Sequence, residues 1–356
     1  MRDSVGVAIL TYKNLGTTLP QTLESLTNQE YRDFRLYVVY KPSPEDNTLA
    51  ILNNYTRKLD ITVIIQREGM FEEALNLALR GISEDLLIFL DDDAIASKQF
   101  VSQHINVHLE HPEIGLLGGY VEPMRNLEAR GSRADALARK LLRINKPLNP
   151  VLTGYSSYPN TAGLLAYNEP VYRPNELRRT MWIEGVNMSA KKEAYQGFEV
   201  PCASLRGSGN EILIGLNAIK KGLQVARTSH CYVNHLDRES LSRPRTKLEQ
   251  LLWHLEHPLM PYKISRTYGH VNTQHLARYH SYISLLRKAK CLAKGRAGPY
   301  IFSHSTILPL TIKAITNSYT PSKVRSELIK IAERLKATSC LLYTSDAADD
   351  GESVDL

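Results

Sequence analysis

Short apolar runs rich in β-forming residues alternate with helix-spaced segments along the N-terminal quarter of the chain. The runs are Val5–Leu10, Phe34–Tyr40, Ile61–Ile65 and Leu86–Leu90, and each has the length and composition of a buried strand. Strands that alternate with helices form βαβ units, which build a mostly parallel sheet flanked by helices. The sequence therefore predicts an α/β, Rossmann-like fold, in which ligands bind at the carboxyl ends of the strands.

The last of these runs ends abruptly in three carboxylates, Asp91, Asp92 and Asp93. Like charges at the end of a buried strand repel one another and resist the loss of water. A hard divalent cation relieves both costs, and Mg²⁺ or Mn²⁺ is typically held by one or two carboxylates together with substrate phosphates. The cluster predicts a Mg²⁺ or Mn²⁺ site, with a solvated acidic turn as the alternative.

From Val5 to about His235 the sequence resembles the family 2 glycosyltransferases. The segments that carry the resemblance include Ala8–Tyr12, Thr22–Gln29, Glu72–Asn76 and Asp91–Asp93. The resemblance implies the GT-A fold, a nucleotide-sugar donor, inversion at the anomeric carbon and a DxD motif. It also implies that Asp91 holds the ribose side of the donor and that Asp93 holds the metal on its diphosphate.

The same resemblance implies the other site residues. Glu184–Ser189 is similar to the segment beside the sugar and acceptor, where Gly185 permits close backbone approach. Gly209–Leu213 is similar to the segment that carries the catalytic base, here Glu211. His235 falls where relatives often place a histidine that faces the metal, and His230 is a rival. The implied donor-binding residues are Thr11, Tyr12, Asp91, Asp92, Gly185 and Asn187, and the implied metal ligands are Asp91, Asp93 and His235.

Each assignment has a plainer structural alternative, and two positions depart from the family pattern. The glycine can mark a bulge in a strand, Glu211 can be an acidic residue in a helix's first turn, and a lone histidine is more often structural. Asn210 replaces the family's usual acid. Tyr40 and Lys41 stand where the second strand often ends in an Asp that reads uracil, so the donor need not be a UDP-sugar.

Charge divides the chain further. From Tyr262 to Ser339 there are 14 Lys and Arg but 2 Asp and Glu, in a segment with helix-spaced apolar stripes. We expect a catalytic domain at 1–240, a variable acceptor loop within it at 124–181, and a basic helical extension at 241–339. The stripes are expected to face the core. A basic segment of this kind usually meets an anionic surface, such as a membrane, nucleic acid or an acidic polymer. We expect an anionic membrane, with charges that are only solvated as the alternative.

The C-terminal end has a different character. Residues 340–356 hold five acidic and no basic side chains, and Cys340–Asp350 resembles a translated transposase adapter. We expect 340–356 to be a non-native tail, with a disordered acidic tail as the alternative. The four scattered cysteines suit a reducing compartment, and no run approaches the ~20 apolar residues of a membrane span. These features predict a cytoplasmic protein that can contact a membrane peripherally.

Taken together, the residues predict a metal-dependent, inverting glycosyltransferase in polysaccharide biosynthesis. The expected partners are a nucleotide-sugar donor, a glycan or lipid-linked acceptor and an anionic membrane surface, and no nucleic acid. One alternative is a non-catalytic nucleotide- or glycan-binding descendant of the fold. A nucleotidyltransferase is the other, although it would usually have a Gly-rich basic loop where this chain has Thr11–Leu15.

Overall fold

The computed structural model describes residues 4–123, 140–167, 177–236, 247–288 and 298–350, with side chains left undescribed at 247–250 and 338–350. The strands are β1 (Val5–Tyr12), β2 (Arg35–Lys41), β3 (Ile61–Ile65), β4 (Leu86–Leu90), β5 (Ala94–Ala96), β6 (Ile114–Glu122), β7 (Ser157–Pro159), β8 (Leu165–Tyr167), β9 (Arg178–Arg179), β10 (Asn187–Lys191) and β11 (Gln224–His235). The helices of the sheet-bearing part are α1 (Leu19–Thr27), α2 (Thr48–Tyr55), α3 (Phe71–Gly81), α4 (Phe100–Glu110), the short η2 (Pro150–Leu152), α6 (Lys192–Tyr195) and α7 (Asn210–Lys220). The C-terminal helices are α8 (Lys247–His254), the short η3 (His257–Leu259), α9 (Met260–Thr267), α10 (Thr273–Lys288), α11 (Gly298–Thr316) and α12 (Pro321–Asp350).

A nine-stranded sheet in the order β3-β2-β1-β4-β10-β6-β11-β5, with β9 on β11, forms the centre of the molecule. The neighbours β3, β2, β1 and β4 are parallel, and β6 is parallel to β11. β10 lies antiparallel between β4 and β6, and β5 and β9 are antiparallel to β11. The strands β1, β2, β3, β4, β6 and β11 therefore share one direction, so their carboxyl ends meet at one edge of the sheet.

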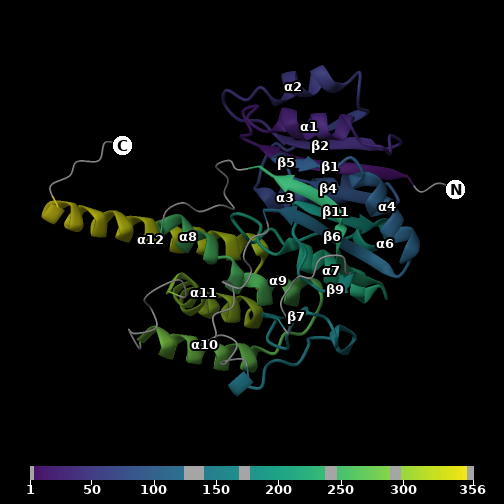
Figure 1. The fold of residues 1–356 in the computed structure, drawn as a ribbon. Helices are drawn as coiled ribbons and strands as arrows, with labels where there is room; N and C mark the ends of the chain where they lie inside the picture. Colours follow the sequence, from purple (N-terminus) through teal and green to yellow (C-terminus); the bar gives the residue numbers. More distant parts are fainter. Residues whose placement is uncertain (1–3, 124–139, 168–176, 237–246, 289–297, 351–356) are drawn as a thin grey trace.

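Alternation of side chains along the strands builds a core on each face of the sheet. On β1, Val7 and Ile9 pack into a cluster with residues of α1 and α4, such as Leu23 and Phe100. Ala8 points to the other face, into a cluster that includes residues of α3 and α7. Figure 1 shows these helices around the sheet. This arrangement confirms the predicted α/β class with a mostly parallel sheet and flanking helices.

The C-terminal helices lie together at one side of the sheet-bearing part (Figure 1). Tyr279 and Ile283 of α10 are buried against α11, and Val324 and Leu328 of α12 are buried in a neighbouring cluster. The described members of both predicted stripes therefore face the core, and the helical C-terminal region is confirmed. No helix among the described residues is both long and apolar enough to cross a bilayer.

The predicted acceptor loop at 124–181 is described only in part. Residues 124–139 and 168–176 lie outside the described residues, whereas the remainder contains η2 and the two-stranded sheet of β7 and β8. The domain boundaries, the acceptor role of this loop and the non-native origin of 340–356 stay predictions.

Candidate active site

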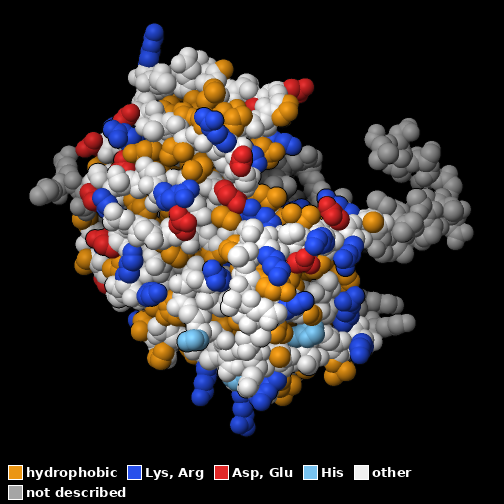
Figure 2. All heavy atoms as spheres, turned by 180° about the vertical axis from the view of Figure 1, so that it is seen from behind, with side chains coloured by type: hydrophobic (Ala, Val, Ile, Leu, Met, Phe, Trp, Pro, Cys, Tyr) orange, Lys and Arg blue, Asp and Glu red, His pale blue; other side chains and the backbone are white. Residues whose placement is uncertain are grey.

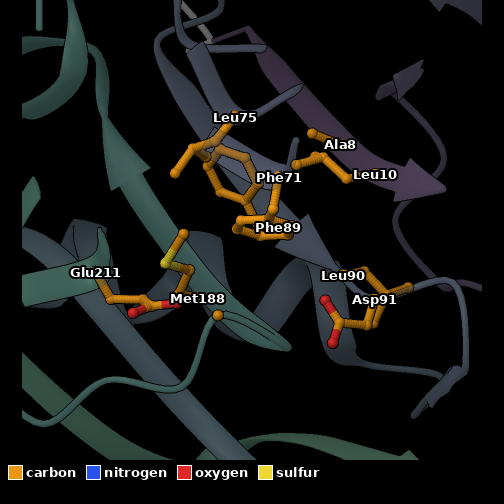
Figure 3. A pocket seen from close by; sticks show the side chains of 10 residues that line it. Ala8, Leu10, Phe71, Leu75, Phe89, Leu90, Asp91, Met188 and Glu211 are labelled. Atoms are coloured by element: carbon orange, nitrogen blue, oxygen red, sulfur yellow. The ribbon is translucent and has the colours of Figure 1, made fainter. Parts of the chain in front are cut away.

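A pocket opens at the carboxyl end of β4, beside the N-terminus of α7 (Figure 3). Its walls are mostly apolar, and two carboxylates, of Asp91 and Glu211, lie on opposite sides of it. The lining residues are Ala8, Leu10, Phe71, Leu75, Phe89, Leu90, Asp91, Gly185, Met188 and Glu211. Ligands of open α/β sheets bind at this edge, so the pocket lies where the fold predicts a binding site.

Asp91, Asp93 and His235 come together beside the pocket. The strand pairing explains this, because His235 ends β11 opposite Ala94, the residue after Asp93. His235 Nε2 lies 2.9 Å from Asp93 Oδ1 and 3.9 Å from Asp91 Oδ2. Asp93 and His235 are buried, whereas the Asp91 side chain is 41% exposed. Asp91 is thus the member of the group that solvent reaches most readily.

This group fits a divalent metal ion. One ligand atom from each of the three residues lies within 4.8 Å of the others, close enough to share an ion. Carboxylate oxygens with one imidazole nitrogen suit Mn²⁺ and are compatible with Mg²⁺. Among the described residues no other group of His, Cys, Asp and Glu meets this criterion. His230, the rival histidine, is exposed and does not join the group.

Asp92 has a different environment from its two neighbours. Its carboxylate is buried and accepts a 2.6 Å hydrogen bond from the Thr11 hydroxyl. Its backbone carbonyl accepts hydrogen bonds from the side chains of Asn14 and Thr18. These contacts tie the loop after β1 to the acidic turn. The predicted contact of Thr11 and Asp92 with the donor stays a prediction.

Asn187 also makes its contacts within the protein. Its amide nitrogen donates to the carbonyls of Tyr120 and Cys231, and its oxygen lies 2.9 Å from His104 Nε2. Both amide hydrogens are therefore committed, and the side chain is fully buried. These contacts fix the start of β10, and the predicted contact of Asn187 with the donor stays a prediction. Its neighbour Gly185, in contrast, does line the pocket.

Glu211 lies in the first turn of α7, and its carboxylate reaches the pocket wall formed by Gly185. A Cβ at position 185 would lie only 2.5 Å from Glu211 Oε1, so the close approach requires glycine there. Burial raises the pKa of Glu211 to about 7; Asp91 and Glu184 also raise it, while a backbone hydrogen bond and Lys263 oppose the shift. A carboxylate with such a pKa is well matched to accept a proton near neutral pH.

Tyr12 ends β1 as a largely exposed aromatic ring between two ammonium groups. Lys41 Nζ lies 4.9 Å and Lys13 Nζ 5.4 Å from the centre of its ring. Lys41 also donates to the carbonyl of Gly69. Lys41, which ends the second strand, therefore places an ammonium group beside this ring.

Several pocket residues were not predicted. Phe71 and Leu75 of α3 and Phe89 of β4 form much of the apolar wall in Figure 3. Their sequence signal is that of ordinary amphipathic and buried elements, which does not distinguish a pocket wall from a core. Only the packing of α3 against the α7 side of the sheet reveals them.

Fold and site together define an α/β protein that binds its ligand at the carboxyl edge of a mostly parallel sheet, next to a metal-suited cluster. Residues 7–173 match the family model described as Glycosyl transferase family 2. The uncharacterized glycosyltransferase YfnE of Bacillus subtilis is 31% identical over 102 residues. That match covers 28% of this chain and 26% of the relative, so the chain aligns with about a quarter of the relative's length.

The chain also resembles solved structures, three of which have TM-scores of 0.46 to 0.48. A mannosyltransferase from Pyrobaculum calidifontis, in complex with GDP-Man and Mn²⁺, is 17% identical over 96% of this chain and 81% of its own, with a TM-score of 0.46. S. aureus TarS in complex with UDP-GlcNAc is 15% identical over 88% of this chain and 91% of its own, with a TM-score of 0.47. Glucosyl-3-phosphoglycerate synthase from Mycobacterium tuberculosis, in complex with Mn²⁺, UDP and glucosyl-3-phosphoglycerate, is 18% identical over 76% of this chain and 82% of its own. Its TM-score is 0.48.

Proposed function

We propose that this protein transfers a sugar from a nucleotide-sugar to a hydroxyl group of a glycan or lipid-linked acceptor. The observation that carries the proposal is the pocket itself, which has a metal-suited cluster on one side and the Glu211 carboxylate on the other. The family of residues 7–173 supports the same reaction class. A nucleotidyltransferase is less compatible, because the loop after β1 has a single glycine, Gly16, and not the glycine-rich sequence that would hold a triphosphate.

Asp91, Asp93 and His235 would hold Mn²⁺ or Mg²⁺ in this reaction. A cation bound there would offset the negative charge of the nucleoside diphosphate as it leaves. Asp91 is the residue best placed to meet the donor as well, since it is the exposed member of the group and also lines the pocket. Tyr12 offers a flat apolar face to the nucleotide base at the end of the adjacent strand.

Glu211 would act as the general base. The acceptor oxygen forms a bond to the anomeric carbon while the bond from that carbon to the diphosphate oxygen breaks. The proton of the attacking hydroxyl passes to the Glu211 carboxylate, and the nucleoside diphosphate leaves with the electron pair. Attack from the side opposite the leaving group inverts the anomeric carbon, which is the stereochemistry that we propose. The apolar wall around Glu211 excludes water and thereby limits hydrolysis of the donor.

A panel of nucleotide-sugars tests the proposal. We expect one donor to raise the melting temperature only when Mn²⁺ or Mg²⁺ is present, because a ligand that binds the native state alone stabilises it. Asp91→Asn and Asp93→Asn should each abolish this metal-dependent shift, whereas Glu211→Gln should keep it and lower turnover roughly 10²–10⁴-fold. Donor affinity that is unchanged in both Asp variants would contradict the metal assignment.

The same experiment addresses the non-catalytic alternative, which the Asn at position 210 favours. A descendant that only binds would show the thermal shift. It would neither transfer the sugar nor slowly hydrolyse the donor, with or without the metal. Release of nucleoside diphosphate, measured with the donor that stabilises the protein most, separates the two functions.

We also propose that the basic C-terminal region brings the protein to anionic membrane surfaces that carry such acceptors. On the face seen in Figure 2, Lys and Arg predominate over the lower half, where the C-terminal helices lie, and Asp and Glu are concentrated in the upper half. Because the apolar stripe of α10 is buried, the attraction would be electrostatic and without insertion.

A further inference from the structure

The loop that leads into the Glu211 helix, residues 204–209, is held by buried charges from outside it. Three of its backbone amides, those of Leu205, Arg206 and Ser208, donate to the carboxylate of Glu256, at 2.6, 2.6 and 3.2 Å. Glu256 is only 2% exposed and precedes η3 in the C-terminal region. A carboxylate that accepts several backbone hydrogen bonds inside a protein fixes the backbone that donates them.

A buried lysine holds the other end of this loop. Lys263 of α9 is 1% exposed, and its ammonium donates to the Ser208 carbonyl at 3.0 Å and to Asn210 Oδ1 at 3.1 Å. Asn210 is the first residue of α7 and immediately precedes Glu211. The amide of Asn210 also donates to the carbonyl of Gly207, which closes the turn. Lys263 thus reaches the backbone and the side chain on either side of Gly209.

Glu72 of α3 completes the arrangement. Its carboxylate pairs with the Lys263 ammonium at 2.5 Å and accepts a hydrogen bond from the Ser204 amide at 2.8 Å. Arg325 of α12 lies 3.1 Å from the same carboxylate and also pairs with Glu73. A buried charge is tolerated only when it is paired and hydrogen-bonded, and Glu72 and Lys263 both meet that condition.

The loop itself has little other means of keeping its shape. Gly207 and Gly209 both have positive φ angles, of 82° and 77°, and a side chain at either position would collide with Phe71 or Met260. The turn is therefore tightly packed, but its backbone amides are satisfied by side chains from distant parts of the sequence. α9, which supplies Lys263, lies beside α7 (Figure 1).

We infer that Glu256 and Lys263 are positioning residues for the transfer reaction, which hold the loop before α7 and thereby place the Glu211 carboxylate in the pocket. This inference rests on the proposed function for its catalytic consequence. It assigns the C-terminal helices a direct part in the site, because both residues lie outside the segment 7–173 that matches the family. Neither residue touches the metal-suited cluster among the described contacts, so neither is expected to affect the donor's metal.

The test uses the full chain and removes the ion pair as a unit. In the double variant Glu72→Gln/Lys263→Met no buried charge of the pair is left, and the side-chain amide oxygen that replaces the Glu72 carboxylate can still accept from Ser204. We expect kcat to fall roughly 10–100-fold, because small misplacements of a catalytic group cost about this much. KM for the donor and its metal-dependent affinity should stay within about twofold, and amide hydrogen exchange in 204–209 should accelerate.

Two further variants keep the result interpretable. Glu256→Gln preserves the shape of the side chain but presents an N–H group where the Ser208 amide donates. It should also lower kcat and accelerate exchange in the loop. If the double variant does not fold, this variant decides the test alone. Lys330→Met removes an exposed ion pair with Glu327 on α12 and should change neither quantity.

Two outcomes would overturn the inference. Unchanged exchange in 204–209 would show that these charges do not hold the loop, and faster exchange with kcat within twofold of the original would show that the loop does not position Glu211. Near-normal turnover of Glu211→Gln would contradict the proposed function and not the hold on the loop. In that case the exchange measurement still shows whether Glu256 and Lys263 hold residues 204–209.

Discussion

The protonation of Glu211 should control turnover near neutral pH. Burial raises the pKa of this carboxyl to about 7, and only the ionised form can accept the acceptor's proton. We therefore expect kcat to decrease as the pH falls through about 7 and to level off above it. The measurement is kcat between about pH 5.5 and 9 at saturating donor and metal. Persistence of the same limb in Glu211→Gln would assign the titration to another group.

Gly185 tests the geometry of the same carboxylate without changing its chemistry. A methyl group at this position would meet Glu211 Oε1 at 2.5 Å, and that oxygen is the far end of a flexible side chain that can move aside. Gly185→Ala should therefore leave the melting temperature within a few degrees and lower kcat by roughly 10-fold or more. Gly81→Ala is the matched control, because Gly81 ends α3 at the opposite end from the pocket residue Phe71 and an added methyl group would meet only Ile64, at 3.3 Å. Equal turnover in the two variants would contradict the assigned position of Glu211.

At the scale of elements, α4 and β10 are joined by a buried network of neutral histidines. His104 Nδ1 and His108 Nε2 both lie within 2.9 Å of the Ser189 hydroxyl, and His104 also contacts Asn187. Burial lowers the pKa of His104 to about 4 and that of His108 to about 3. The network holds β10, and with it the approach to Gly185, against the helix that follows the acidic turn.

These histidines should make the fold sensitive to acid. Because the folded-state pKa lies below the unfolded value of 6.5, their stabilising contribution is complete above about pH 6.5 and is lost progressively as the pH falls toward 4. For His104 the loss is on the order of 3 kcal/mol at pH 4. Urea unfolding at pH 7 and near pH 4.5 should show a smaller pH dependence in His104→Gln than in the parent chain or in the surface control His111→Gln. An equal pH dependence in all three would contradict this account.

Across the whole molecule, charge and catalytic machinery are separated. The sheet-bearing part holds the metal-suited cluster, and the segment from Tyr262 to Ser339 carries a net charge of +12. The Arg287 guanidinium stacks on the Phe302 ring and donates to the Ser305 hydroxyl, whereas the Lys288 side chain is exposed. With Lys290, Lys294 and Arg296, which lie outside the described residues, they form a run of five basic residues that we call the C-terminal cluster.

We expect the protein to bind vesicles that contain anionic lipid at low salt and to be released at high salt. Each Lys or Arg near such a surface contributes about 1 kcal/mol, and salt screens that attraction. Co-sedimentation should be lost when Arg287, Lys288, Lys290, Lys294 and Arg296 are replaced by Gln. It should be retained when five exposed basic residues of the sheet-bearing part are replaced, namely Arg35, Arg57, Lys58, Arg67 and Arg80. Binding that is insensitive to the first set would exclude the C-terminal cluster as the contact.

The order of strands and helices and the acidic turn after β4 could be predicted because they depend on local sequence. Apolar runs such as Leu86–Leu90 must be buried whatever surrounds them, and adjacent carboxylates at the end of such a strand call for a cation. The resemblance singled out Glu211 and His235 without a structure, and the pairing of β11 with β5 explains why His235 lies beside Asp91 and Asp93. Those predictions required only short-range patterns and one family likeness.

The tertiary structure decided which polar residues are available to a ligand. Thr11, Asp92 and Asn187 carry groups that could bind a donor, but each is committed to partners that are distant in sequence, and pairing over such distances leaves no local pattern. Lys263 and Glu256 show the converse: charged side chains read as surface residues from sequence alone. Both are buried because they bind the loop before Glu211: Glu256 accepts from its backbone amides, and Lys263 donates to its carbonyl at Ser208. These contacts form only when the C-terminal helices pack beside α7.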